Sequence, residues 1–263
     1  MAVDTYIKQA QYRVRAEQEA IDEELRSYKM FIRRVQELQP DQTPSSVAGL
    51  TTAGGTTHLS GDASSADGCR TVRTVFAETI RPHSVADIDE PESVLETIGE
   101  EFTDTIAVAL APTTEAAFTP ELKQMVLAEA QSRRSEATAL QKALEREEAH
   151  VDDASDVVDD IIDWIVDANE TPLTDLGFDA LQQRHEMLAN HRDRCENVAR
   201  DRQEFLEGTT NNGVDAGVRH RSFIPYLYQD FSVDHPVLAT VAKLNETCQE
   251  CQQAVRDHLV RRG

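Results

Sequence analysis

Apolar side chains recur every three, four or seven positions through the first 39 residues. From Val3 to Gln39 this stripe is broken only where Glu17 and Glu24 take positions in it. The spacing is that of a coiled-coil seam, so it predicts one long amphipathic helix that must pack on another helix. The seam residues expected to make the contact are Ile7, Val14, Ile21, Tyr28 and Ile32.

Residues 40–69 interrupt the pattern. Pro40 ends the helix, and 15 of the 29 residues from Pro40 to Gly68 are Gly, Ser or Thr, with no apolar period. Such a composition predicts a flexible, disordered linker. The sequence therefore predicts three parts: a detached N-terminal helix (1–39), the linker (40–69) and a helical bundle domain (70–263).

Helical periodicity returns after the linker in several segments. Proline lies at three of the predicted starts, as Pro91, Pro120 and Pro236, where its missing N–H costs nothing. The predicted helices cover about 72–80, 91–111, 119–168, 178–208 and 236–261. The connection near residue 170 is short, so the two long helices around it should form an antiparallel hairpin.

One residue and one loop stand out in this region. Glu147 is the single polar position in the apolar stripe of the longest helix, and residues 223–231 form the only dense aromatic cluster. We expect this aromatic loop to plug the end of the helical bundle, the alternative being a ligand or partner patch.

The composition supports a helical fold. Hydrophobic residues make up 40% of the 263-residue chain and aromatic residues only 5%, which suits helix-on-helix packing. We predict an all-α fold in which long coiled-coil-like helices form an elongated antiparallel bundle, with a disordered Gly/Ser/Thr linker.

The charge adds a hypothesis about the solvent. The net charge is −22, and the basic residues are 21 Arg but only 5 Lys. A dense carboxylate surface is tolerated where salt screens it, and guanidinium pairs bidentately with carboxylate. We therefore expect an acidic, halophilic protein. Four cysteines do not make a disulfide framework, and no apolar run could span a membrane, so a cytoplasmic location is expected.

Several segments are similar to those of a known family. They are Val72-Arg73 through Glu78-Thr79, Glu101-Phe102, Leu122 to Arg134, Tyr226 to Asp230, and Pro236 to Ala242. Together they resemble an uncharacterised helical family of haloarchaea, a domain of unknown function. The resemblance covers most of the chain outside the linker; it implies a salt-adapted helical protein and assigns no site residues.

The cysteines are the first candidates for chemistry. His191 and Cys195 share one helix face, and Cys248 and Cys251 lie one turn apart on the last predicted helix. If the two helices pack together, the four side chains could form a Cys₃His zinc site. Packed core residues are favoured instead, because closed zinc sites usually draw ligands from knuckles and loops.

Other motifs fail on spacing. His185-Glu186 lacks the second histidine of a zinc protease at the required distance, and Asp62 to Gly68 lacks the terminal Glu of a calcium loop. Seven aspartates lie on the back of the longest helix and are predicted to form a solvated face: Asp152, Asp153, Asp156, Asp159, Asp160, Asp163 and Asp167. We expect no catalytic, cofactor-binding or metal-binding residues and no enzymatic activity.

Nucleic acid is disfavoured as a partner. The pairs Arg33-Arg34, Arg133-Arg134 and Arg261-Arg262 each have acidic residues nearby, which predicts surface ion pairs and no basic stripe. The favoured function is an interaction or scaffold protein that binds a second copy or a helical partner through coiled-coil helices. The alternative is a regulator that binds nucleic acid or a protein through the Arg-rich and aromatic loop 219–231.

Overall fold

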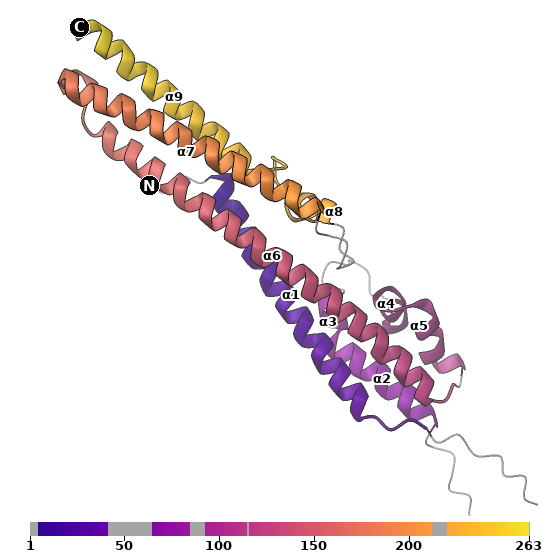
Figure 1. Ribbon diagram of the computed structural model, residues 1–263. Helices are drawn as coiled ribbons and strands as arrows, with labels where there is room; N and C mark the ends of the chain where they lie inside the picture. Colours follow the sequence, from indigo (N-terminus) through magenta and orange to yellow (C-terminus); the bar gives the residue numbers. More distant parts are fainter. Residues whose placement is uncertain (1–4, 42–64, 85–92, 115, 212–219, 263) are drawn as a thin grey trace, which may run out of the picture. The chain divides into compact units, whose positions relative to one another are not determined.

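A computed structural model describes residues 5–41, 65–84, 93–114, 116–211 and 220–262, and all regular structure in these ranges is helical (Figure 1). The helices are α1 (Tyr6–Glu37), α2 (Ser65–Thr79), α3 (Arg81–Ser84), α4 (Val94–Glu101), α5 (Asp104–Leu110), η1 (Pro112–Thr114), α6 (Pro120–Asn169), η2 (Leu173–Asp175), α7 (Phe178–Asn211), α8 (His220–Leu227) and α9 (Pro236–Arg262). The all-α prediction is confirmed.

Helix packing divides the chain into two units. Unit 1 consists of Met1–Gln18 and Leu140–Gly263, and unit 2 is Glu19–Ala139. The division therefore falls inside α1 and inside α6. It differs from the predicted parts 1–39, 40–69 and 70–263, because each half of α1 buries its apolar stripe in one of the two units.

The predicted dimer seam lies in the interior of the chain. Ile7 and Val14 are buried in unit 1, and Ile21, Tyr28 and Ile32 are buried in unit 2, none of them more than 6% exposed. The expectation that these five side chains contact a second copy is wrong. A helix stripe has to be covered, and here α6 of the same chain runs antiparallel to α1 and covers it.

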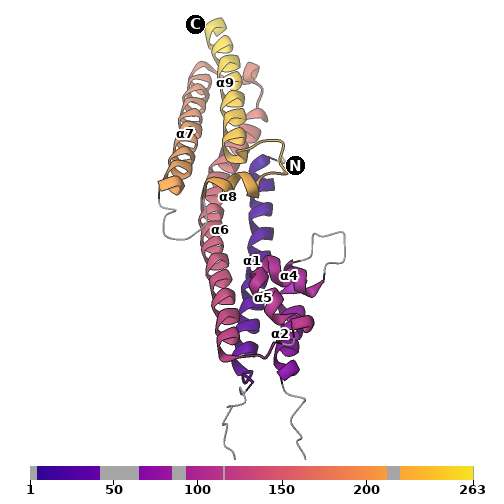
Figure 2. The ribbon, with the colours of Figure 1, turned by 90° about the vertical axis from the view of Figure 1, so that its right-hand side faces the viewer.

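Unit 1 is built on long antiparallel helices. Asp160 of α6 pairs with Arg194 of α7 at 3.0 Å, and the ring centres of Trp164 and His191 lie 4.7 Å apart in a tilted contact, so the predicted α6–α7 hairpin is confirmed. Helices α7 and α9 lie side by side in both views (Figures 1 and 2). Apolar side chains from α1, α6, α7 and α9 form the core between them.

Unit 2 gathers short helices against the other halves of α1 and α6 (Figure 2). Its centre is aromatic: the rings of Phe31, Phe76 and Phe102 lie 5.5–6.0 Å apart. Such ring pairs stabilise a core by about 0.5–1.5 kcal/mol beyond the area they bury. At the edge of this core, Tyr28 donates a hydrogen bond to Glu101 at 2.7 Å.

The helix predicted for residues 91–111 is two helices. The first begins after Ser93, which forms a capping box with Glu96. The chain then breaks after Phe102, and the Thr103 hydroxyl accepts from the Ile106 N–H at the start of α5. An N-cap of this kind contributes about 1 kcal/mol, which favours restarting a helix over continuing one.

The end of the predicted linker is helical. Residues 42–64 lie outside the described ranges, whereas α2 begins at Ser65 and buries Cys69. A Cβ atom on Gly68 would come within 2.6 Å of Phe118, so this glycine permits a close approach of α2 to the Phe118 side chain.

Candidate functional site

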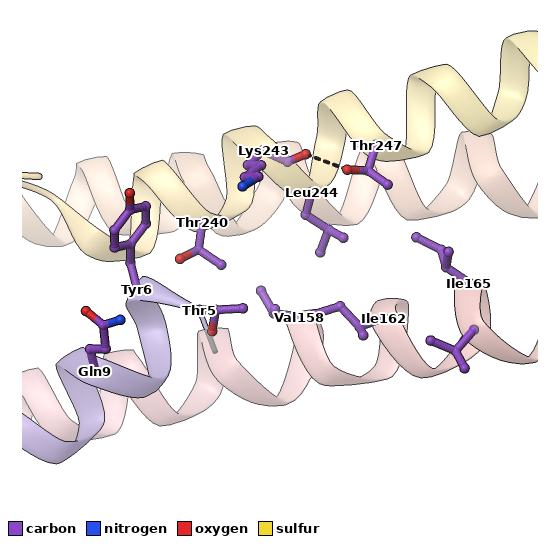
Figure 3. A pocket seen from close by; sticks show the side chains of 11 residues that line it. Thr5, Tyr6, Gln9, Val158, Ile162, Ile165, Thr240, Lys243, Leu244 and Thr247 are labelled. Carbon is purple, nitrogen blue, oxygen red and sulfur yellow. Dashed lines mark hydrogen bonds between the residues drawn. The ribbon is translucent and has the colours of Figure 1, made fainter. Parts of the chain in front are cut away.

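An apolar groove of about 440 Å³ opens in unit 1 at the start of α1 (Figure 3). Helix α6 contributes Val158, Ile162, Ile165 and Val166, and α9 contributes Thr240, Lys243, Leu244 and Thr247. Thr5, Tyr6 and Gln9 close one end. Among the described residues α1 begins at Tyr6, while α6 and α9 continue past that point.

Thr240 and Lys243 are two polar residues of this groove whose side chains have no partner among the described residues. Thr240 is only 6% exposed, and its hydroxyl has no hydrogen-bond partner in the part of the chain that the structure describes. Its side chain points into the space between α6 and α9 (Figure 3). Leaving such a buried group unpaired costs about 1–3 kcal/mol, so a ligand that supplies a partner would recover this energy.

Lys243 is the other unpaired group. It is exposed, lines the groove, and makes no ion pair within the described residues. Apolar walls with a single cation suit an amphipathic ligand that carries a carboxylate. No carboxylate is among the groove's lining residues, so they offer no acid–base pair for proton transfer.

A buried ion pair lies deeper in unit 1. Glu147, the polar break in the α6 stripe, is fully buried and accepts two hydrogen bonds from Arg202, at 2.7 and 2.8 Å. Tyr228 donates a third at 2.6 Å, and burial together with the Glu147 charge raises the pKa of this tyrosine. The Arg202 guanidinium also lies 5.1 Å from the Phe205 ring centre. The carboxylate is thus held by one group from α7 and one from the turn that follows α8.

The aromatic segment supplies part of this core. Residues 220–227 form helix α8, where the sequence analysis expected a loop. Four of its side chains are buried: Phe223, Ile224, Leu227 and Tyr228. These residues therefore pack in the interior, which was the favoured expectation, while Tyr226 is 52% exposed. Arg219 of the alternative hypothesis lies outside the described residues.

The predicted zinc ligands only partly converge. Cys195 of α7 and Cys248 of α9 are buried and hydrogen-bonded to each other, which lowers the pKa of Cys195 and raises that of Cys248. His191 contacts the Trp164 ring instead. Within the described ranges no three His, Cys, Asp or Glu side chains are placed to hold a metal ion. The structure brings two of the four candidates together.

The aspartate face of α6 is open to solvent, as predicted, and it also carries ion pairs that the sequence pattern did not predict. Asp159 pairs with Lys8, Asp152 with Arg15, and Asp160 with Arg194. Three of the seven aspartates therefore bind cations from neighbouring helices of unit 1. The sequence pattern could not show this, because it gives the outer face of one helix without its neighbours.

The arginine pairs divide between two roles. Arg34 pairs with Glu78 at 2.7 Å, and Arg133 lies within 3.5 Å of both Glu129 and Glu136. Their neighbours Arg33 and Arg134 form no ion pair in the described ranges and line one hollow of unit 2. The expectation that nearby acidic residues offset every helical pair is wrong for these two residues.

These features define a class: an all-α protein with a cation-bearing apolar groove between long helices. No helix in the described ranges is long and apolar enough to cross a membrane. The chain belongs to the family described as a domain of unknown function (DUF7260), whose model matches residues 5–252. No curated protein and no solved structure matches the chain.

Proposed function

We propose that the chain is a non-enzymatic helical interaction protein that binds an amphipathic α-helix of a partner in the groove between α6 and α9. The observation that carries this proposal is an apolar surface that the described residues leave uncovered, where Ile162, Ile165 and Leu244 face an open space. In the rest of unit 1 the same stripe of α6 is covered by helices.

A helix fits this space by its shape and chemistry. The lining runs from Val158 to Val166 on α6, about 12 Å at 1.5 Å per residue, which is roughly two turns. Apolar residues of the partner at positions i, i+3, i+4 and i+7 would fill the groove. A carboxylate on the partner helix, one turn from its apolar residues, would meet Lys243. A polar group of the partner would form a hydrogen bond with the Thr240 hydroxyl.

The expected salt adaptation favours this mode of binding. Molar salt shortens the Debye length to about 3 Å and weakens contacts between surface charges. Burial of apolar area does not depend on such contacts. A protein with a net charge of −22 in concentrated salt would therefore bind most reliably through an apolar surface.

The test is a selection of helical peptides against the full chain in about 2 M KCl. We expect binders with an apolar stripe and an acidic residue, and at least a tenfold loss of affinity in Val166→Glu, because Val166 is 56% exposed in the groove. The matched control is Val108→Glu, at 61% exposure in unit 2, which should leave affinity unchanged.

A charge exchange sharpens the test. Lys243→Glu should weaken the binding of acidic peptides. It should strengthen the binding of the same peptides when Lys replaces their acidic residue. Equal binding by the Val166 and Val108 variants would overturn the proposal. The alternative function through residues 219–231 stays a prediction, supported now only by the exposed Tyr226, since its other described aromatic residues are at least partly buried.

A further inference from the structure

A cationic hollow of about 520 Å³ lies in unit 2 between α1 and α6. Arg26, Lys29 and Arg33 come from α1, where their spacing of three and four residues puts them on one face, and Arg134 comes from α6. Unit 2 holds 10 basic and 21 acidic residues, so four of its ten cations gather in one place on a strongly acidic unit.

Three of these four cations lack the acidic partners that Arg34 and Arg133 of unit 2 have. The only ion pair among the four is Arg26 with Asp22, at 3.8 Å and well exposed to solvent. Lys29, Arg33 and Arg134 form no ion pair within the described ranges. Bringing like charges together without carboxylates is unfavourable, and the adjacent Arg34 and Arg133 show that acidic partners are within reach of neighbouring positions.

We propose that this hollow binds a compact ligand with two or more adjacent phosphate groups. Phosphate oxygens accept several guanidinium hydrogen bonds at once, and Gln36 and Gln131 add amide donors to the same lining. Met30, whose side chain is 46% exposed, supplies an apolar part that could hold an uncharged ring of the ligand. The volume is within the range of small-molecule sites.

The surroundings favour a compact ligand over a nucleic-acid chain. Asp22 and Glu23 precede the cationic face of α1, Glu37 follows it, and Glu136 follows Arg134 on α6. A polymer leaving the hollow along either helix would meet these carboxylates. A small phosphorylated molecule stays within the reach of the four cations.

The experiment is calorimetric titration of the full chain with sodium triphosphate and, separately, ATP, at 0.5 and at 2 M KCl, the higher salt being that of the peptide selection. The variant is the double Arg33→Gln/Arg134→Gln; both side chains are exposed. The control is Arg146→Gln/Arg256→Gln, two exposed arginines of unit 1, which changes the net charge equally. We expect the hollow variant to bind at least tenfold more weakly and the control to bind as wild type.

The outcomes are distinct. Tighter binding of ATP than of triphosphate would show that the nucleoside contributes to binding, and equal binding would assign the site to phosphate groups alone. Equal weakening in both double variants would overturn the proposal, as would no binding of either probe. A single-stranded 20-mer that binds more tightly than triphosphate, with the same loss in the hollow variant, would replace the compact ligand by nucleic acid. Lys29→Gln should weaken triphosphate binding in the same direction, and its failure to do so would count against the site.

Discussion

The two units carry the same net charge but place particular arginines in different surroundings. Counted from the sequence, each unit has a net charge of −11. In unit 1, Arg202 is 3% exposed and completes a buried network with Glu147 and Tyr228. In unit 2, the core is built on three phenylalanines, and Arg33 and Arg134 stay at the surface without ion pairs.

This difference separates two tasks of a polar side chain. A buried carboxylate with several donors accepts only one alignment of the helices that carry them, so it fixes the relative positions of α6 and α7 in unit 1. An exposed, unpaired guanidinium contributes little to folding and is available to a ligand. The comparison therefore predicts that unit 1 loses most stability when a residue of its buried polar network is replaced. Unit 2 should lose most when an apolar core residue is replaced.

The largest expected effect is in the buried pair. Glu147→Ala leaves Arg202 buried without its counter-charge and should lower the free energy of unfolding by about 3–5 kcal/mol. Urea denaturation followed by the fluorescence of Trp164, the only tryptophan and a residue of unit 1, measures this. The control is Glu147→Leu with Arg202→Met, which should recover most of the loss. If the double variant is as unstable as the single one, the charge pair is not the cause.

Next in size is the aromatic core of unit 2. Phe102→Leu removes ring contacts with Phe31 and Phe76 and should cost about 2 kcal/mol. Hydrogen exchange should become faster in α2, α4 and α5, while the Trp164 transition keeps its midpoint. An equal shift of the Trp164 transition would mean that the two units unfold together, and the comparison between them would lose its meaning.

A smaller effect is expected at the groove. Thr240→Val replaces an unpaired buried hydroxyl by a methyl group and should stabilise the free protein by about 1 kcal/mol. The same variant should bind the selected helical peptides more weakly. Stabilisation without any loss of peptide affinity would show that the hydroxyl does not contact the partner.

The smallest effect is a dependence on pH. Burial, and then the Arg194 charge, lower the pKa of His191, which is 4% exposed with both ring nitrogens unpaired among the described residues. The unfolded chain therefore binds the proton more tightly than the folded chain. The free energy of unfolding keeps its full value above about pH 6.5 and falls as the pH drops below that value. His191→Phe should flatten this loss between pH 7 and 5 in the Trp164 transition. An unchanged slope would exclude His191 as its source.

The fold was largely predictable from local signals. Proline after a threonine, a glutamate or a histidine marks helix starts, and Pro120 and Pro236 are the observed first residues of α6 and α9. The restart at Thr103 was missed because the apolar stripe continues across it. Which helix covers a stripe is a tertiary property, so the periodicity of α1 could not distinguish a dimer from packing within the chain.

The sites depended on pairings between distant positions. Glu147 was visible as a polar break, but its partner Arg202 is one arginine among many on α7. Likewise, Arg33 and Arg134 were judged against acidic neighbours along the sequence, while the hollow forms across two helices. Among the described residues the groove lies where α1 begins beside α6 and α9, and no periodicity records that offset.

The division of α1 between the units has a consequence for synthesis on the ribosome. Unit 2 is one continuous stretch, whereas Met1–Gln18 belongs with residues that begin at Leu140. At typical translation rates of 5–20 residues per second, roughly ten seconds pass before the first part of that partner is made. During this interval Ile7, Ala10 and Val14 have no native surface to cover them. The start of this chain is therefore the segment for which a nascent-chain chaperone has the most to do.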